Sequence, residues 1–179
     1  REESDLPDVF VSAGFESFFD HRNLGRFGDR GAFVDVAPAG QNDSFGDLQL
    51  RDPRGRFTMI AAVPAVFLVN HGFLDGAPAP CSWADLLDPR LHDRVALPVG
   101  DFDLFNAVLI DLHRRFGDEA VAALAHNMLA ALHPSQTVGR FANKQAQPAV
   151  SVVPYFFSRM TAGSKRLQRV WPEDGALIS

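Results

Sequence analysis

Residues 57–69 read Phe-Thr-Met-Ile-Ala-Ala-Val-Pro-Ala-Val-Phe-Leu-Val and carry Pro64 near their centre. This stretch is apolar enough for a buried strand, yet proline has no backbone N–H to donate to a central sheet ladder. Two strands that meet at Pro64 resolve the conflict most simply. We therefore predict that the chain crosses at Pro64 between two packing environments, as in a two-lobed protein that closes on something held between its lobes.

The composition limits the classes of protein that this chain can belong to. Its 179 residues can bury one good core or two small ones. The net charge of −5 argues against nucleic acid as a partner, because phosphate binding needs a basic surface. A bilayer span needs about 20 apolar residues, more than the longest apolar run offers. Cys81 is the only cysteine, which excludes an intrachain disulfide and a cysteine metal cluster and fits either cytoplasm or periplasm.

Both ends of the chain look cut. Residues 1–5 are charged and polar and do not form a signal peptide, and residues 8–12 read as a buried strand after almost no lead-in. Residues 176–179 stop inside an apolar stretch. We expect residues to be missing on both sides, so that a removed leader would leave no trace.

Strands and helices alternate along the chain. The strand at 8–12 is followed by a short helical pattern through Phe15, Phe18 and Phe19, and residues 20–56 read as irregular with one short strand at 32–36. Further strands are predicted at 94–98, 149–157, with Pro154 inside it, and 167–171, and helices at Ser82–Leu87, Asp101–Phe116 and Asp118–Leu132. This order predicts an α/β fold with a parallel or mixed sheet.

Two of these helices show clear apolar faces. Asp101–Phe116 has one built from Phe105, Leu109, Leu112 and Phe116. Gly117 closes that helix and Asp118 caps the next one, whose stripe is the most regular in the chain. The stripe comprises Val121, Leu124, Ala125, Met128, Leu129 and Leu132.

Several local signatures then occur in one order. Val63-Pro-Ala-Val-Phe-Leu-Val-Asn70 is followed by Pro80-Cys-Ser-Trp-Ala-Asp-Leu-Leu-Asp-Pro89 and Arg94-Val-Ala-Leu-Pro98, and later by Ser151-Val-Val-Pro-Tyr-Phe-Phe157 and Val170-Trp-Pro-Glu-Asp-Gly-Ala-Leu177. From about Asp8 to its end, the chain resembles the type II extracellular solute-binding proteins of bacterial ABC importers, in the ferric-iron and polyamine-like branch.

That resemblance implies two α/β lobes joined by crossover hinge strands, with the ligand in the cleft. Residues 1–65 would be a partial first lobe and 66–172 the second lobe, and 173–179 would start the return crossing. The rest of the first lobe, which this family builds after the second crossing, is absent from the chain.

Four places qualify as ligand contacts, because ligands of such clamps meet strand ends and helix starts. The first is the turn at Ser12 and Gly14, which a plain strand–helix turn explains equally well. The second is Asp101 and Asp103 at the start of the long helix, where a helix cap is the ordinary role. Two carboxylates at a cleft would instead favour a metal or an ammonium group.

The third place comprises His133, Ser135 and Gln136, where the histidine could also simply complement a helix C-terminus. The fourth is Tyr155, the only tyrosine, on a strand beside a proline, where an aromatic residue is most often core. Ferric-binding relatives use a pair of adjacent tyrosines, and this chain has no such pair. The departure counts against tyrosinate-type iron binding but leaves other metals or a chelated metal open.

The remaining basic residues give weaker signals. The other histidines lack the spacing of a metal site such as H-E-x-x-H. Arg140, Lys144 and Arg159 could meet an anionic ligand, although scattered basic residues are usually solvated.

The resemblance therefore implies a periplasmic or lipid-tethered receptor that delivers a small polar solute, a metal ion or a metal chelate to an ABC permease. We expect a monomer with no cofactor, no nucleic-acid partner and no catalytic role. One alternative is the effector-sensing domain of a transcription regulator, although no helix-turn-helix segment is seen. A small-molecule enzyme is a weaker alternative, because the sequence has no P-loop, Rossmann or nucleophile-elbow motif. A structural interaction domain is a further one.

Overall fold

The computed structural model describes residues 3–12, 18, 20–22, 25–37, 50–136 and 147–178. The chain divides into two compact units, Arg1–Ala62 and Val63–Ser179, called unit 1 and unit 2 below.

Unit 1 has little regular structure in its described part. It contains the 3-10 helix η1 (Glu3–Asp5) and the α-helix α2 (Gly25–Asp29), which the sequence reading missed. The predicted strands at 8–12 and 32–36 are wrong, since neither range forms one. Val9 and Val11 are 73% and 70% exposed, so the apolar residues of 8–12 are not buried. Most of the helix predicted through Phe15 and Phe19 lies outside the described residues.

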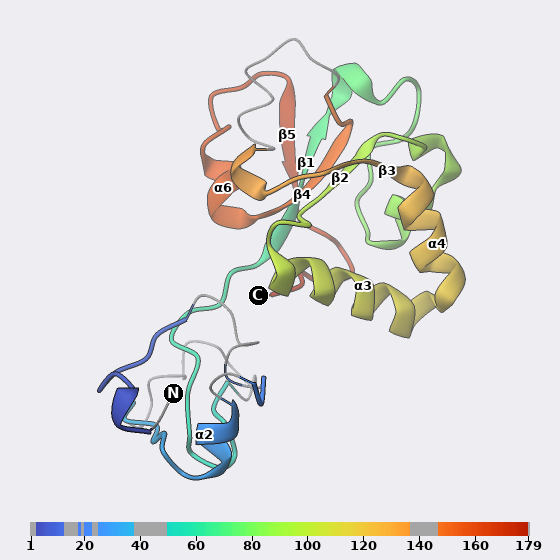
Figure 1. Cartoon of the computed structure of the whole chain (residues 1–179). Helices are drawn as coiled ribbons and strands as arrows, with labels where there is room; N and C mark the ends of the chain where they lie inside the picture. Colours follow the sequence, from blue (N-terminus) through green and yellow to red (C-terminus); the bar gives the residue numbers. More distant parts are fainter. Residues whose placement is uncertain are drawn as a thin grey trace. The chain divides into compact units, whose positions relative to one another are not determined.

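Unit 2 is built around a five-stranded mixed sheet in the order β3-β2-β4-β1-β5, as the alternation of elements predicts (Figure 1). The strands are β1 (Ala65–Asn70), β2 (Val95–Leu97), β3 (Met128–Ala131), β4 (Val150–Pro154) and β5 (Leu167–Val170). β2 runs parallel to β3 and β4, whereas β1 runs antiparallel to β4 and β5. Four strands therefore point the same way, and β1 alone is reversed.

The apolar stretch around Pro64 forms one strand. β1 begins immediately after Pro64 and all six of its residues are buried. The predicted strand before Pro64 is wrong, and Thr58 makes only an isolated bridge with Arg51. Pro64 forms an isolated antiparallel bridge with Ile178, so the segment after β5 returns beside the residue that precedes β1. The missing N–H of Pro64 interrupts no ladder bond here, because the N–H of Ala65 donates to the carbonyl oxygen of Leu177 at 2.7 Å. The carbonyl oxygen of Pro64 accepts from the backbone N–H of Tyr155 at 2.8 Å.

Helices cover both faces of the sheet. The main core lies on one face, where α3 (Phe102–Phe116) contributes Leu104, Val108 and Leu112, and α4 (Asp118–Asn127) contributes Ala120 and Leu124. On the other face, α6 (Tyr155–Arg159) packs against β1 and β4 (Figure 1). The 3-10 helices are η3 (His71–Phe73), η4 (Ala84–Leu87) and η5 (Pro89–Leu91).

Three predicted elements end earlier than their apolar patterns do, or present a different face. Phe116 is exposed, so the buried face of α3 is rotated from the predicted one. The long stripe after Gly117 is helical only to Asn127, and Met128–Ala131 is strand β3. Asp118 is the first residue of α4 and Gly117 is its N-cap. Tyr155 lies in α6 and not on a strand, because β4 ends at Pro154.

The capping box predicted at Ser82 forms, although the 3-10 helix η4 itself begins at Ala84. The backbone N–H of Ser82 donates to the carboxylate of Asp85 at 2.9 Å, and the N–H of Asp85 donates back to Ser82 Oγ at 3.3 Å. This reciprocal pair is a capping box, and it begins the short helix η4. Within the described residues, no helix has the length and apolar character needed to cross a membrane.

Candidate ligand site

Three of the four predicted places lie at one edge of the unit 2 sheet. The loop to Asp101 follows β2, His133 follows β3 and Tyr155 follows β4, and these three strands are mutually parallel. Their carboxyl ends therefore meet at the same edge, which is where α/β sheets bind ligands. Trp171 follows β5 at this edge, and Pro64 precedes the reversed β1 there. We call this the strand-end edge.

Gly100 and His133 lie against each other at this edge. A Cβ atom on Gly100 would be 2.9 Å from Cβ of His133 and 3.0 Å from its Cα. Only glycine allows this approach, so the loop after β2 and the chain after β3 meet backbone to side chain. The backbone N–H of Leu132 also donates to the carbonyl oxygen of Leu97 at 3.1 Å, which holds the two strand ends together.

His133, Ser135 and Gln136 form one hydrogen-bonded turn. The backbone N–H of His133 donates to Oε1 of Gln136 at 3.1 Å. Nδ1 of His133 accepts from the backbone N–H of Ser135 at 3.2 Å and lies 2.7 Å from its Oγ. Because Nδ1 accepts a backbone hydrogen bond, neutral His133 carries its proton on Nε2. The three side chains remain exposed, so the turn orders them at the surface.

Aromatic rings extend the edge from His133 to the end of β5. The His133 ring meets Phe157 edge-on, with centroids 6.1 Å apart. Tyr155 lies 5.1 Å from Trp171 at an interplanar angle of 31°. The guanidinium carbon of Arg169 lies 5.0 Å from the centroid of the Tyr155 ring. The ring of half-buried Tyr155 thus contacts Trp171, which follows β5, while its backbone N–H donates to the carbonyl oxygen of Pro64.

The two predicted carboxylates have different surroundings. Oδ1 of Asp101 accepts from the backbone N–H of Leu104 at 3.3 Å, so Asp101 caps α3, its ordinary role. Asp103 is partly buried in the first turn of the same helix. Both are near the strand-end edge, where a contact with ligand stays a prediction.

The first predicted place belongs to unit 1. Ser12 is described and partly buried, but Gly14 lies outside the described residues. The contribution of this turn to a ligand site also stays a prediction.

Sequence reading did not select Trp171, Arg169 or Phe157 as site residues. Trp171 belongs to the W-P-E-D-G motif, so the sequence does carry a signal for it. Arg169 is one exposed residue of a short strand and carries no signal by itself.

The described residues offer no group of three or more His, Cys, Asp or Glu side chains that could hold a metal ion. Cys81 donates its thiol hydrogen to Asp85 at 3.3 Å. That hydrogen bond to a carboxylate raises the pKa of the thiol, so Cys81 is a poor thiolate ligand.

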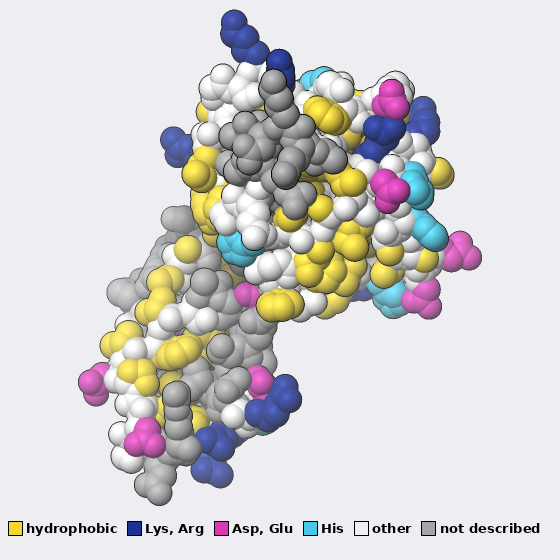
Figure 2. Space-filling model, turned by 45° about the horizontal axis from the view of Figure 1, so that its top comes forward, with side chains coloured by type: hydrophobic (Ala, Val, Ile, Leu, Met, Phe, Trp, Pro, Cys, Tyr) yellow, Lys and Arg dark blue, Asp and Glu magenta, His cyan; other side chains and the backbone are white. Residues whose placement is uncertain are grey.

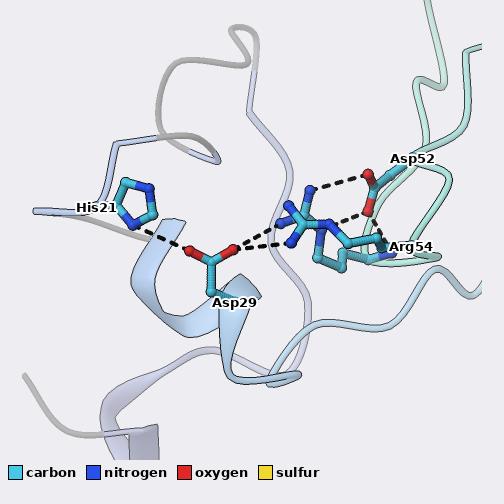
Figure 3. Close-up of polar contacts among 5 residues, drawn as sticks. His21, Asp29, Asp52 and Arg54 are labelled. Carbon is cyan, nitrogen blue, oxygen red and sulfur yellow. Dashed lines mark hydrogen bonds and ion pairs between the residues drawn. The ribbon is translucent and has the colours of Figure 1, made fainter.

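Unit 1 contains a separate polar cluster around Asp29 and Asp52 (Figure 3). Asp29 accepts from Arg54 at 3.4 Å and from Arg56 at 3.3 Å, and it lies 3.2 Å from Nδ1 of His21. Arg56 also pairs with Asp52 at 2.6 Å, and this hydrogen bond lowers the pKa of Asp52 to about 2. Each arginine has a carboxylate partner, so the cluster ties residues 52–56 to α2.

A surface groove of about 580 Å³ lies between α3 and α4. It is lined by Leu109, Ile110, His113, Asp118, Val121, Ala122 and Ala125 and contains none of the predicted site residues. Figure 2 shows hydrophobic side chains in the middle of the larger unit in that view, with charged side chains mostly around its margin.

Comparison with known proteins identifies the family of this chain. The chain belongs to the bacterial extracellular solute-binding proteins, whose family model matches residues 4–179. This is a family of transport binding proteins, as the sequence motifs imply. Among proteins of curated function, no relative reaches the level of a match.

Solved structures give the same fold. The periplasmic binding protein P5PA is 17% identical at a TM-score of 0.62, over 91% of this chain and 54% of that one. The apo ferric ion-binding protein A of Pasteurella haemolytica is 15% identical at a TM-score of 0.61, over 87% of this chain and 53% of that one. A spermidine/putrescine ABC transporter candidate from Listeria monocytogenes is 14% identical at a TM-score of 0.52, over 84% of this chain and 51% of that one. The fold is thus the type II periplasmic binding protein fold, and the chain spans about half the length of these structures.

Proposed function

We propose that this protein is the substrate-binding receptor of an ABC importer. The carrying observation is the strand-end edge, where Asp101, His133 and Tyr155 follow three parallel strands of a chain from a solute-binding family. A small solute bound there would be passed to a membrane permease. We place the protein in the periplasm or on a lipid tether outside the cell, as a monomer without catalytic activity.

Unit 2 would be the second lobe of a clamp, and unit 1 part of the first. The two chain crossings would then be residues near Pro64 and Ile178, which pair with each other. Tyr155 supports this proposal because its N–H binds the carbonyl of Pro64 while its ring touches Trp171. A ligand on Tyr155 would lie beside the Pro64 crossing and beside the residue that follows β5, and such contacts would favour the closed form.

The comparison proteins suggest which solutes to test. One is named for ferric ion and another for spermidine and putrescine. The sensing domain of a transcription regulator, the alternative reading, gains no support from the strand-end edge or from the family.

A thermal-shift screen of the full-length protein tests the proposal. It should include metal ions and chelates, polyamines, phosphonates and small carboxylates. A ligand at 100 times its Kd stabilises the folded state by about 2.7 kcal/mol, which raises Tm by several degrees. At least one class should do so. If no class shifts Tm and the protein instead turns over one of the compounds, the receptor proposal is wrong.

A further inference from the structure

Trp171 offers an open aromatic surface at the strand-end edge. Its side chain is 48% exposed, whereas Trp83, the other tryptophan of the chain, is fully buried. Tyr155 supports the indole at 5.1 Å and a small interplanar angle of 31°. A large flat ring held in this way is a rigid stacking surface, because few rotamers are lost when a ligand binds.

Arg169 places a positive charge beside this surface. Its guanidinium lies over the Tyr155 ring at 5.0 Å, and it makes a long hydrogen bond of 3.4 Å to Ser158 Oγ. Within the described part of the chain, no carboxylate forms an ion pair with Arg169. A stacked guanidinium keeps its N–H groups in a fixed plane, which suits the two oxygens of a carboxylate or phosphate group.

The nearby carboxylates are engaged elsewhere. Asp174 accepts from Arg115 at 2.7 Å and from the backbone N–H of Trp83. Asp101 caps α3, and the side chain of Glu173 lies beside the thiol of Cys81. The guanidinium of Arg169 is the charge that lies over the Tyr155 ring of the aromatic pair, so this part of the edge complements an anion.

We propose that Trp171 and Arg169 form a subsite for an organic anion that carries a planar ring. The ring would stack on Trp171 and the acidic group would bind Arg169. This rests on the proposed receptor function and narrows its substrate class. A polyamine fits poorly because its ammonium group would face the guanidinium, and a bare metal ion would leave the aromatic surface unused.

Binding of three matched probes to the full-length protein, measured by calorimetry, tests the subsite. Phenylphosphonate has both features, methylphosphonate lacks the ring, and benzylamine carries the opposite charge. We expect phenylphosphonate to bind at least tenfold more tightly than methylphosphonate, and benzylamine not to bind. Arg169→Gln should weaken the binding of phenylphosphonate at least tenfold. Trp171→Leu should weaken it by a similar factor but leave the affinity for methylphosphonate unchanged.

Two control variants match these substitutions. Arg166→Gln removes an exposed arginine just before β5, and Phe73→Leu removes an exposed ring that follows the opposite end of β1. Both should bind phenylphosphonate like the wild type, and all four variants should remain folded at the temperature of the binding measurement.

The outcomes separate the subsite from the receptor function. If ferric citrate or spermidine binds and phenylphosphonate does not, the subsite is wrong and the receptor function stands. Equal loss of phenylphosphonate binding in Arg166→Gln and Arg169→Gln also overturns the subsite. If no solute of any class binds, both the subsite and the receptor function are wrong.

Discussion

The indole N–H of Trp83 donates a hydrogen bond of 2.8 Å to the carbonyl oxygen of Gly175, 92 residues further along the chain. The backbone N–H of Trp83 donates to the carboxylate of Asp174, which also accepts from Arg115 at 2.7 Å. The motifs S-W-A-D-L-L-D-P and W-P-E-D-G thus make one contact. That contact attaches the segment after β5 to the start of η4 and to Arg115 of α3. The same segment then pairs with Pro64 through Ile178.

Replacing Trp83 with phenylalanine should destabilise the chain by about 1–3 kcal/mol. The substitution removes the hydrogen bond to Gly175 and leaves a small cavity beside Phe67, whose ring meets the indole edge-on at 5.0 Å. Urea unfolding measures the loss. Phe73→Leu, at an exposed ring, should change stability by less than about 0.5 kcal/mol. Equal stability of Trp83→Phe and wild type would contradict the role of this contact.

Replacing Gly100 with alanine should displace His133. The new methyl group would lie 2.9 Å from Cβ of His133, so the turn that holds Ser135 and Gln136 must move. We expect a loss of about 1–3 kcal/mol in stability, the usual cost of overpacking, together with weaker ligand binding. Gly163→Ala is the matched control, because no atom lies within 4 Å of its added methyl group. Wild-type binding by Gly100→Ala would argue against His133 as a site residue.

The pair of Asp52 and Arg56 predicts an acid-sensitive unit 1. The hydrogen bond from Arg56 lowers the pKa of Asp52 from 3.8 to about 2. As the pH falls, Asp52 is therefore protonated in the unfolded state before it is protonated in the folded state. The stabilisation is complete above pH 3.8 and is lost as the pH falls toward 2. Urea midpoints between pH 2 and 6 should therefore fall more steeply for wild type than for Asp52→Asn. Equal slopes in the two proteins would contradict this role of the ion pair.

Cys81 should react slowly with alkylating reagents. Its hydrogen bond to Asp85 raises the thiol pKa, because the neighbouring carboxylate disfavours the thiolate. The rate of iodoacetamide labelling should rise only at a pH above the ordinary thiol range. Asp85→Asn should move that rise to lower pH, whereas Asp88→Asn, three residues on, should not. An unchanged profile in Asp85→Asn would contradict this account of the thiol.

The fold class follows from sequence because alternation and apolar runs are local signals. β2, α3 and β5 all lie within one residue of their predicted starts. The end of α4 could not be predicted in this way, since the apolar stripe continues through Met128 and Leu129. It is set by buried Asn127, whose side-chain amide donates to the carbonyl oxygens of Leu86 and Asp88 at 2.8 and 2.9 Å. Such a tertiary contact leaves no periodic trace.

The candidate site was predictable in part for the same reason. Asp101, His133 and Tyr155 stand after apolar stretches, and three strands that share a direction bring them to one edge. Arg169 and Trp171 join them only because β5 pairs with the reversed β1, a register that the sequence pattern does not determine.

The central claim is that the strand-end edge binds the solute, and hydrogen exchange of the full-length protein tests it most directly. The compound with the largest thermal shift would be added and amide protection compared with the free protein. We predict increased protection at residues 98–104, 132–136 and 154–158, after β2, β3 and β4, and no change at residues 71–77, after β1. Protection at 71–77 with none at the three strand ends would contradict the account.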